Sequence, residues 1–509
     1  MPPSLADWLP ADHFAWFLLA TVEQLDLAAF YEAYRPDGLG RPAFDQRLMV
    51  GLLLYAYSKG QQSSRGIELG CVEDVGYRVV AANQKPDHAT IARFRRRHEA
   101  ALAGLLGSVL GLCAESGLVS VGMIAIDGSK LSANASQESS YDYERIAREI
   151  LAEAERIDRE EDELHGDARG DELPEHLRTP EGRKAALAEA KRKLAERKQQ
   201  AGADEPQPEP EPEPGPEPEG SVEVELELDP VAIVASQGGR QGWFREARRQ
   251  LDRRRETEAT SMPRSRAARL LEAERRLQEN LAAARVANER YEEFRATGRM
   301  KNGRRFGAPP KPYLVPDSPE GKINLTDLDS GSMKTLRGHM QGYNAQLACN
   351  EQQIVIAAEV TIVAPDFGVL EPMVTATLRE LEAAGIKDRP EVVLADAGYW
   401  HQTQMENVIN QGMQVLIPPD AANRKGARPG WQGGYYEHMR RVLSSDYGGG
   451  LYKRRQAMIE PVFAHTKFNR GITRFMRRGR SAVRSEWRLI AATHNLLKLH
   501  RHQMAAAGG

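Results

Sequence analysis

The segment that decides the fold reads VGMIAIDGSK and covers residues 121–130. Its first six residues are apolar or small, which is typical of a buried β-strand, and Asp127 follows them directly. A second segment, VVLADAGYW at residues 392–400, repeats this arrangement with Asp396 after its apolar run. Because side chains at the carboxyl ends of strands gather at one rim of an α/β sheet, both aspartates are predicted to lie at one site there.

A third acid, Glu460, lies in a basic helical segment near the C-terminus. Three carboxylates that converge on one point repel one another, and divalent cations relieve this repulsion. Oxygen ligands of this kind suit Mg²⁺, for which Mn²⁺ can substitute, and bound metal activates a water or a 3′-hydroxyl in phosphodiester chemistry. Each acid alone is better explained as a turn Asp, a helix cap or a surface Glu. The order of strand with Asp, strand with Asp and helix with Glu favours the joint site.

The rest of the chain is organised around these strands. Residues 1–118 have helical apolar spacing and predict an N-terminal all-helical domain. Residues 119–136 and 323–509 form the split α/β domain, apart from a Gly-rich stretch at 419–450 that suggests a loop. Residues 137–322 suggest an insertion of charged helical arms, and its Pro/Glu tract at about 201–229 suggests a disordered, solvated linker.

Two basic segments are candidates for contact with nucleic acid. The first follows a helix start signal at Asp87 and suggests the second helix of a helix-turn-helix, although a helical bundle with a solvated basic face explains it equally well. Its arginines are Arg93, Arg95, Arg96 and Arg97. The second segment follows Glu460 and includes Arg470, Arg474, Arg477 and Arg478. Such clusters suit the neutralisation of several phosphates.

The net charge of the whole chain does not reveal these basic segments, because an acidic tract offsets them. The formal net charge is −3, but residues 204–229 hold eleven carboxylates without a Lys or Arg, and residues 451–509 carry thirteen Lys and Arg against two Glu. Three scattered cysteines argue against a disulfide scaffold or a zinc cluster. The longest apolar runs are half of what a bilayer span needs, and no signal peptide is evident, so we expect a cytoplasmic protein without a membrane partner.

Several longer blocks resemble the DDE transposases of bacterial insertion sequences. They are, in order, PDHATIARFRRRHE, IAIDGSKLSANAS, NLTDLDSGSMKTLRGHMQGYNAQLA, VVLADAGYW, IEPVFAHTKFNRGITRFMRRG and ATHNLLKL. The resemblance implies a ribonuclease H-like mixed sheet flanked by helices. It also implies that Asp127, Asp396 and Glu460 are catalytic and bind metal. The substrate would be double-stranded DNA, at terminal inverted repeats and at a target, bound by a homodimer in the bacterial nucleoid.

The resemblance is imperfect in the C-terminal signature of Tyr, Arg, Glu and Lys. The family places Tyr seven and Arg four residues before the Glu, where this chain has Lys453 and Gln456. Tyr452 and Arg455 stand one residue earlier, whereas Lys467 fits the Lys position. All three of Tyr452, Arg455 and Lys467 are candidates for DNA contact, and Trp431 and Tyr435 are candidates for stacking on a flipped base, although ordinary loop hydrophobes explain them too.

Two functions follow from these patterns. An active transposase binds its terminal repeats, cleaves at the ends and joins 3′-hydroxyls to target DNA. A catalytically silent repressor or architectural protein of the same descent keeps the basic segments but does not need the three acids together. All three acids are present, which favours the first.

Overall fold

The computed structural model describes residues 7–34, 43–165, 188, 191–192, 228–235, 239–257, 262–299, 303–305, 312–335, 338–420 and 433–507. These residues form two compact units. Unit 1 comprises residues 1–135 and 329–509, and unit 2 comprises residues 136–328. The expected Pro/Glu linker and Trp431 lie outside the described residues, apart from positions 228–229.

A mixed sheet is the centre of unit 1. Its strands are β1 (Met123–Ser132), β4 (Gly331–Thr335), β5 (Gly338–Asn350), β6 (Val355–Thr361), β7 (Val392–Leu394) and β8 (Gln414–Leu416). The order is β4-β5-β1-β7-β8, and β6 also pairs with β5. β5 is antiparallel to β1 and β6, whereas β1, β7 and β8 are parallel. This topology, with three antiparallel strands followed by parallel ones, confirms the expected ribonuclease H-like mixed α/β fold.

Seven helices precede the sheet within the described residues. They are α1 (Phe14–Gln24), α2 (Ala28–Tyr31), α3 (Gln46–Ser58), α4 (Ser64–Glu73), α5 (Val75–Val80), α6 (His88–Arg97) and α7 (Glu99–Glu115). The side chain of Ser63 caps α4, and that of Asp87 caps α6 by accepting from the Thr90 amide at 2.7 Å. Because α5 lies between α4 and α6, the two are not joined by a simple turn.

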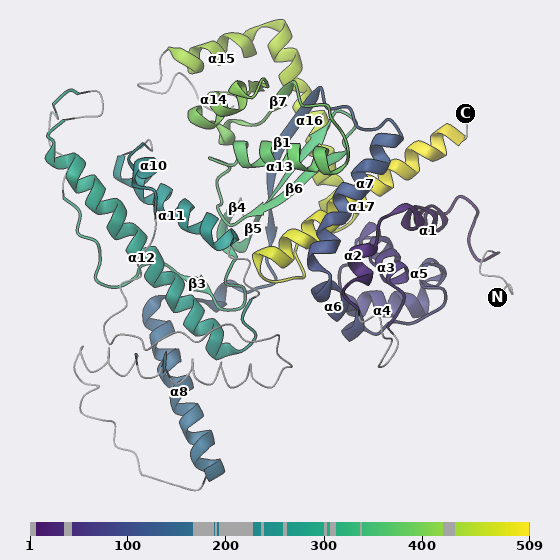
Figure 1. Ribbon diagram of the computed structural model, residues 1–509, viewed down its shortest axis with the longest axis horizontal. Coiled ribbons are helices and arrows are strands. Elements are labelled where there is room, and N and C mark those ends of the chain that lie inside the picture. The colour runs from purple at the N-terminus through teal and green to yellow at the C-terminus, as the bar shows by residue number, and fades with distance from the viewer. Residues whose placement is uncertain are drawn as a thin grey trace. The chain divides into compact units, whose positions relative to one another are not determined.

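The remaining helices of unit 1 cover the sheet. They are α13 (Leu370–Ala383), α14 (Gln402–Asn410), α15 (Gly434–Ser444), α16 (Asp446–Ala464) and α17 (Arg480–Ala507), with a short 3-10 turn η4 (Ala397–Tyr399) and a π-helix η5 (His465–Asn469). α7 and α17 lie side by side over β6 (Figure 1). The N-terminal helices and the sheet share one continuous hydrophobic core. Within the described part of the chain, every helix is too short or too polar to span a bilayer.

The prediction of a loop over residues 419–450 was wrong for its second half, which contains α15 and the start of α16. Ser445 caps α16 by accepting from the Gly448 amide at 3.1 Å. Position 448 in the first turn of α16 requires glycine, because a Cβ there would lie 2.2 Å from the carbonyl oxygen of Val442. The glycines therefore allow α15 and α16 to pack closely rather than marking irregular chain.

In its described residues, unit 2 consists mainly of helices and has one short two-stranded ribbon. Its elements are η2 (Gln137–Ser139), β2 (Ser140–Tyr141), α8 (Tyr143–His165), α10 (Pro230–Ala235), α11 (Gly239–Thr257), α12 (Arg266–Ala296) and β3 (Ile323–Asn324). α8 packs on α12 through Ile146, Ile150 and Leu277. The two ends of the unit meet in the β2–β3 pair, where Ser140 lies opposite Asn324. The charged helical arms expected from the sequence are thus built around their own small cores.

Candidate active site

Asp127 and Asp396 are brought together by the register of two parallel strands. Ala125 of β1 lies opposite Leu394 of β7, and this register, continued by two residues, sets Asp127 beside Asp396. Neighbouring strands run about 4.8 Å apart. The side chain of Asp396 accepts from the Gly398 amide at 2.8 Å and caps η4. Asp396 lies just after the end of β7 as expected, whereas Asp127 lies within β1, which continues to Ser132 beside β5 beyond the part that pairs with β7.

The electrostatics of Asp127 reflect burial and a crowded charge environment. Burial and, to a smaller extent, the Asp396 carboxylate raise the pKa of Asp127, and Arg455 lowers it, so that the resulting pKa is about 6. Burial also raises the pKa of Asp396. Two carboxylates that both resist ionisation form a site in which added positive charge is favourable.

Arg455 supplies part of that charge. Its Nη1 lies 2.8 Å from Oδ2 of Asp127, and both side chains are largely buried. Burial raises the pKa of Tyr452, one turn earlier on α16, and so does the Asp396 carboxylate. The one-residue offset from the family signature therefore does not displace these side chains, since Tyr452 and Arg455 themselves face the aspartates.

Lys467 reaches the same strand from the π-helix η5. Its Nζ donates to Oγ of Ser129 at 2.5 Å and to the carbonyl of Lys130 at 3.2 Å. Lys467 follows Arg455 by twelve residues, one more than in the family signature. A π-helix is an α-helix that accommodates one extra residue, so η5 absorbs this excess and turns Lys467 back towards β1.

The structure does not bring Glu460 together with the two aspartates. Glu460 follows Arg455 by five residues, which on an α-helix at about 100° per residue sets it about 140° away around α16. The Glu460 side chain is exposed. In the described ranges, no three His, Cys, Asp or Glu side chains lie close enough together to hold a metal ion. The position four residues after Arg455 is instead the buried Ile459.

Asp366, which sequence analysis missed, lies next to this site. Its Oδ1 accepts from the side-chain amides of Asn344 and Gln346, both at 2.8 Å. The Asp366 carboxylate also raises the pKa of Asp396. Asp366 lies in the connection between β6 and α13, directly after Pro365 and five residues after β6 ends, so it did not stand out as a strand-end carboxylate.

Gly128 leaves the space that this arrangement needs. A Cβ there would lie 2.2 Å from Nε2 of Gln346 and 2.6 Å from Oδ1 of Asp366.

We expect Gly128→Ala to displace the Gln346–Asp366 pair and to lower the free energy of unfolding by about 1–3 kcal/mol, as overpacking does in a filled core. Urea denaturation measures this change. Gly104→Ala is the control, because nothing lies within 4 Å of a Cβ there. Equal stability of the two variants would contradict the expectation.

The predicted DNA contacts fall into two groups. Arg95 and Arg470 are buried, so the expectation that they contact DNA was wrong for both. Arg95 donates to the hydroxyl of Tyr57 at 2.9 Å, and Arg470 donates to the carbonyl of Tyr57, also at 2.9 Å. Basic composition could not separate such structural arginines from exposed ones.

The other candidates are at least partly accessible. Arg477 is half-buried and pairs with Glu99 at 2.7 Å. Tyr435 is half-buried in α15. The exposed arginines are Arg93, Arg96, Arg97, Arg474 and Arg478.

Two family models match the chain. Residues 3–97 match a transposase domain (DUF772), and residues 425–500 match a transposase DDE domain. Neither a curated protein nor a solved structure matches significantly. Together the two matches support a DDE transposase of insertion sequences and confirm the resemblance noted in the sequence. The second match includes α15, α16, η5 and most of α17, the segment that carries Tyr452, Arg455 and Lys467.

Proposed function

We propose that this chain is an active DNA transposase that binds the terminal inverted repeats of an insertion sequence, cleaves phosphodiester bonds at its ends and joins the 3′-hydroxyls to target DNA. The observation that carries the proposal is the proximity of Asp127 on β1 to Asp396, which follows the parallel strand β7 by two residues. The transposase family matches support the class of reaction. Pairing of two ends by a homodimer in the nucleoid belongs to the same proposal.

The two aspartates fit a divalent cation. Mg²⁺ is commonly held through one or two carboxylates and completes its shell with water and substrate phosphate. Asp127 and Asp396 offer such a pair, and burial raises the pKa of both carboxyls although Arg455 opposes the shift. When bound, Mg²⁺ or Mn²⁺ would activate the attacking oxygen and stabilise the leaving one.

The residues around the aspartates have roles that follow from their positions. Arg455, Tyr452 and Lys467 line the same side of β1 and would orient the scissile phosphate. Arg93, Arg96, Arg97, Arg474 and Arg478 are exposed and would contact the DNA backbone. For Glu460, whose side chain is exposed on α16, the catalytic role rests on the family resemblance alone.

A catalytically silent DNA-binding protein is the second candidate, because Glu460 stands apart from the aspartates in this structure. Cleavage of a supercoiled plasmid that carries the element's ends separates the two functions. We expect cleavage with Mg²⁺ or Mn²⁺ and none after chelation, and we expect Glu460→Gln to reduce the cleavage rate strongly without loss of binding. Binding without cleavage by the parent protein would favour the silent alternative. Full cleavage by Glu460→Gln would remove Glu460 from the mechanism and leave the aspartate pair.

A further inference from the structure

Helix α11 of unit 2 is unusually rich in arginine. Of its nineteen residues, seven are Arg and three are acidic. The arginines are Arg240, Arg245, Arg248, Arg249, Arg253, Arg254 and Arg255. Trp243, Ala247 and Leu251 are buried, so this side of α11 packs into the core that unit 2 builds around α12. The opposite side of the helix is free to carry charge.

Four of the arginines form a row on that opposite side. Arg245, Arg249 and Arg253 follow one another at intervals of four residues, which sets them one above the other at about 6 Å per step. Arg248 flanks this series. Arg245, Arg248 and Arg253 are exposed, and Arg249 is half-buried. We call these four residues the α11 arginine row.

The charges of the row are poorly compensated within the protein. Arg249 lies 3.4 Å from Glu246. Arg245 donates to the backbone carbonyl of Gln241 rather than to a carboxylate. Over the residues that the structure describes, Arg248 and Arg253 have no carboxylate within ion-pair distance. Burial lowers the pKa of Arg249, and Arg253 and Arg245 lower it further, so the cations of the row repel one another.

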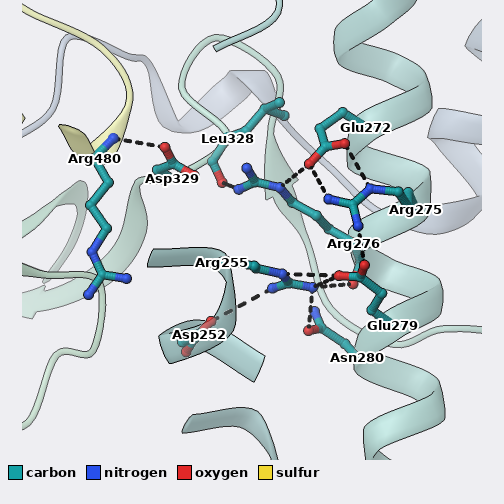
Figure 2. Close-up of polar contacts among 10 residues, drawn as sticks. All are labelled: Asp252, Arg255, Glu272, Arg275, Arg276, Glu279, Asn280, Leu328, Asp329 and Arg480. Carbon is teal, nitrogen blue, oxygen red and sulfur yellow. Dashed lines mark hydrogen bonds and ion pairs between the residues drawn. The ribbon is translucent and has the colours of Figure 1, made fainter. Parts of the chain in front are cut away.

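Several arginines elsewhere in unit 2 are paired with acids. Figure 2 shows Glu272 between Arg275 and Arg276, and Glu279 in contact with Arg255. These ion pairs lie along α12 and where α11 packs on it. Within the row, Arg249 has Glu246 as a partner, whereas the described residues give Arg245, Arg248 and Arg253 no carboxylate within ion-pair distance. Because like charges four residues apart destabilise a helix, the charges of these three arginines do not stabilise α11.

The surface beside the row is concave. Arg245 and Arg248 line a pocket of about 390 Å³ together with Phe244 and Tyr313, and one acid, Glu320, also lines it. Aromatic and guanidinium side chains around a hollow of this size suit a sugar-phosphate segment, since the arginines can reach phosphate oxygens while the rings contact the sugar.

We propose that the α11 arginine row is a binding surface for the phosphate backbone of double-stranded DNA. The inference rests on the proposed function, because it assigns to the inserted unit a share in holding the DNA on which the chain acts. Duplex DNA carries one negative charge per about 1.7 Å of its axis, and each phosphate neutralised by a cation releases counterions. The row would contribute affinity without sequence preference.

The test is the salt dependence of DNA binding by the full chain. The variant combines Arg245→Ala, Arg248→Ala and Arg253→Ala, and the control combines Arg285→Ala, Arg290→Ala and Arg299→Ala, which removes the same charge from exposed positions elsewhere in unit 2. Binding to a short duplex of arbitrary sequence is measured over a range of NaCl concentrations. We expect the row variant to reduce the slope of log affinity against log salt by about 2.7, at about 0.9 per lost contact, and the affinity to fall on the order of 100-fold at ~0.1 M salt.

The melting temperature of each variant is measured alongside. Loss of mutual repulsion should leave the row variant as stable as the parent or more so, which separates lost contact from lost folding. A row variant whose slope and affinity equal those of the control would overturn the inference while leaving the proposed function intact. A parent chain that binds no duplex even at low salt would overturn both.

Discussion

Asp127→Asn is expected to abolish cleavage of the element's ends, with a rate at least about 10³-fold lower, because it removes a charge that would hold the catalytic metal. Binding of DNA should persist, since the basic surfaces are unchanged. Gel analysis of plasmid cleavage and a parallel binding assay measure the two effects. Asp388→Asn is the control, because Asp388 is exposed and precedes β7, at the opposite end of that strand from Asp396. Cleavage by the Asp127 variant at the parent rate would refute the role of this residue.

The same substitution should stabilise the metal-free protein near neutral pH. The pKa of Asp127 is about 6 in the folded chain against an ordinary 3.8, so the folded state favours the protonated form. This contribution to stability is complete below pH 3.8 and is lost as the pH rises through about 6. We therefore expect Asp127→Asn to unfold at a higher temperature than the parent at pH 7.5 in chelator, by an amount worth at most about 3 kcal/mol. The difference should shrink as the pH falls towards 4, and a constant difference would contradict the pKa.

Arg488→Met should lower the free energy of unfolding by about 3–5 kcal/mol, because it strands a buried carboxylate. The Arg488 guanidinium donates to both oxygens of Glu380, at 2.8 and 2.6 Å, and its Nε donates to the carbonyl of Ala103 at 2.8 Å. Both charged side chains are about 95% buried. These contacts tie α17 to α13 and α7, so urea denaturation should report the loss as reduced stability of unit 1.

Arg379→Met is the matched control for this pair. Arg379 also contacts Glu380, at 3.1 Å, but about half of its side chain is exposed. Exposed ion pairs contribute about 1 kcal/mol or less. Combining Arg488→Met with Glu380→Leu should restore much of the stability, because no buried charge is then left unpaired. Equal destabilisation by Arg379→Met and Arg488→Met would show that burial of the pair is not what matters.

The sequence was most informative where local chemistry determines structure. Apolar runs that end in Asp127 and Asp396 predicted both strands and their shared rim, because burial of a strand requires such runs. The helix start signal at Asp87 was confirmed because its side chain accepts from the Thr90 amide at the start of α6. The family resemblance supplied the mixed sheet, which no local pattern carries.

The burial of individual charged side chains and their distance from the site depend on long-range packing, which local sequence patterns do not predict. Arg95 and Arg97 are two residues apart in one basic run, yet only Arg95 turns inwards to the hydroxyl of Tyr57. Glu460 lies on a different face of α16 from Arg455 because five residues separate them. The π-helix η5 begins only at His465, so its extra residue shifts the position of Lys467 but not that of Glu460. Asp366 could be identified as a neighbour of the site only from the tertiary structure, in which side-chain amides of β5, the strand next to β1, donate to it.

The short β2–β3 ribbon has a consequence for how such a chain could have been assembled. It holds the beginning and the end of unit 2 within one strand spacing of each other, so the polypeptide leaves and re-enters unit 1 at nearly the same point. Unit 2 spans almost two hundred residues, yet its β2–β3 pair already brings its two ends together. The entropy cost of closing this long loop is therefore offset by contacts within unit 2. Such a joint lets an insert lengthen, shorten or be exchanged over generations while the strands on either side keep their register.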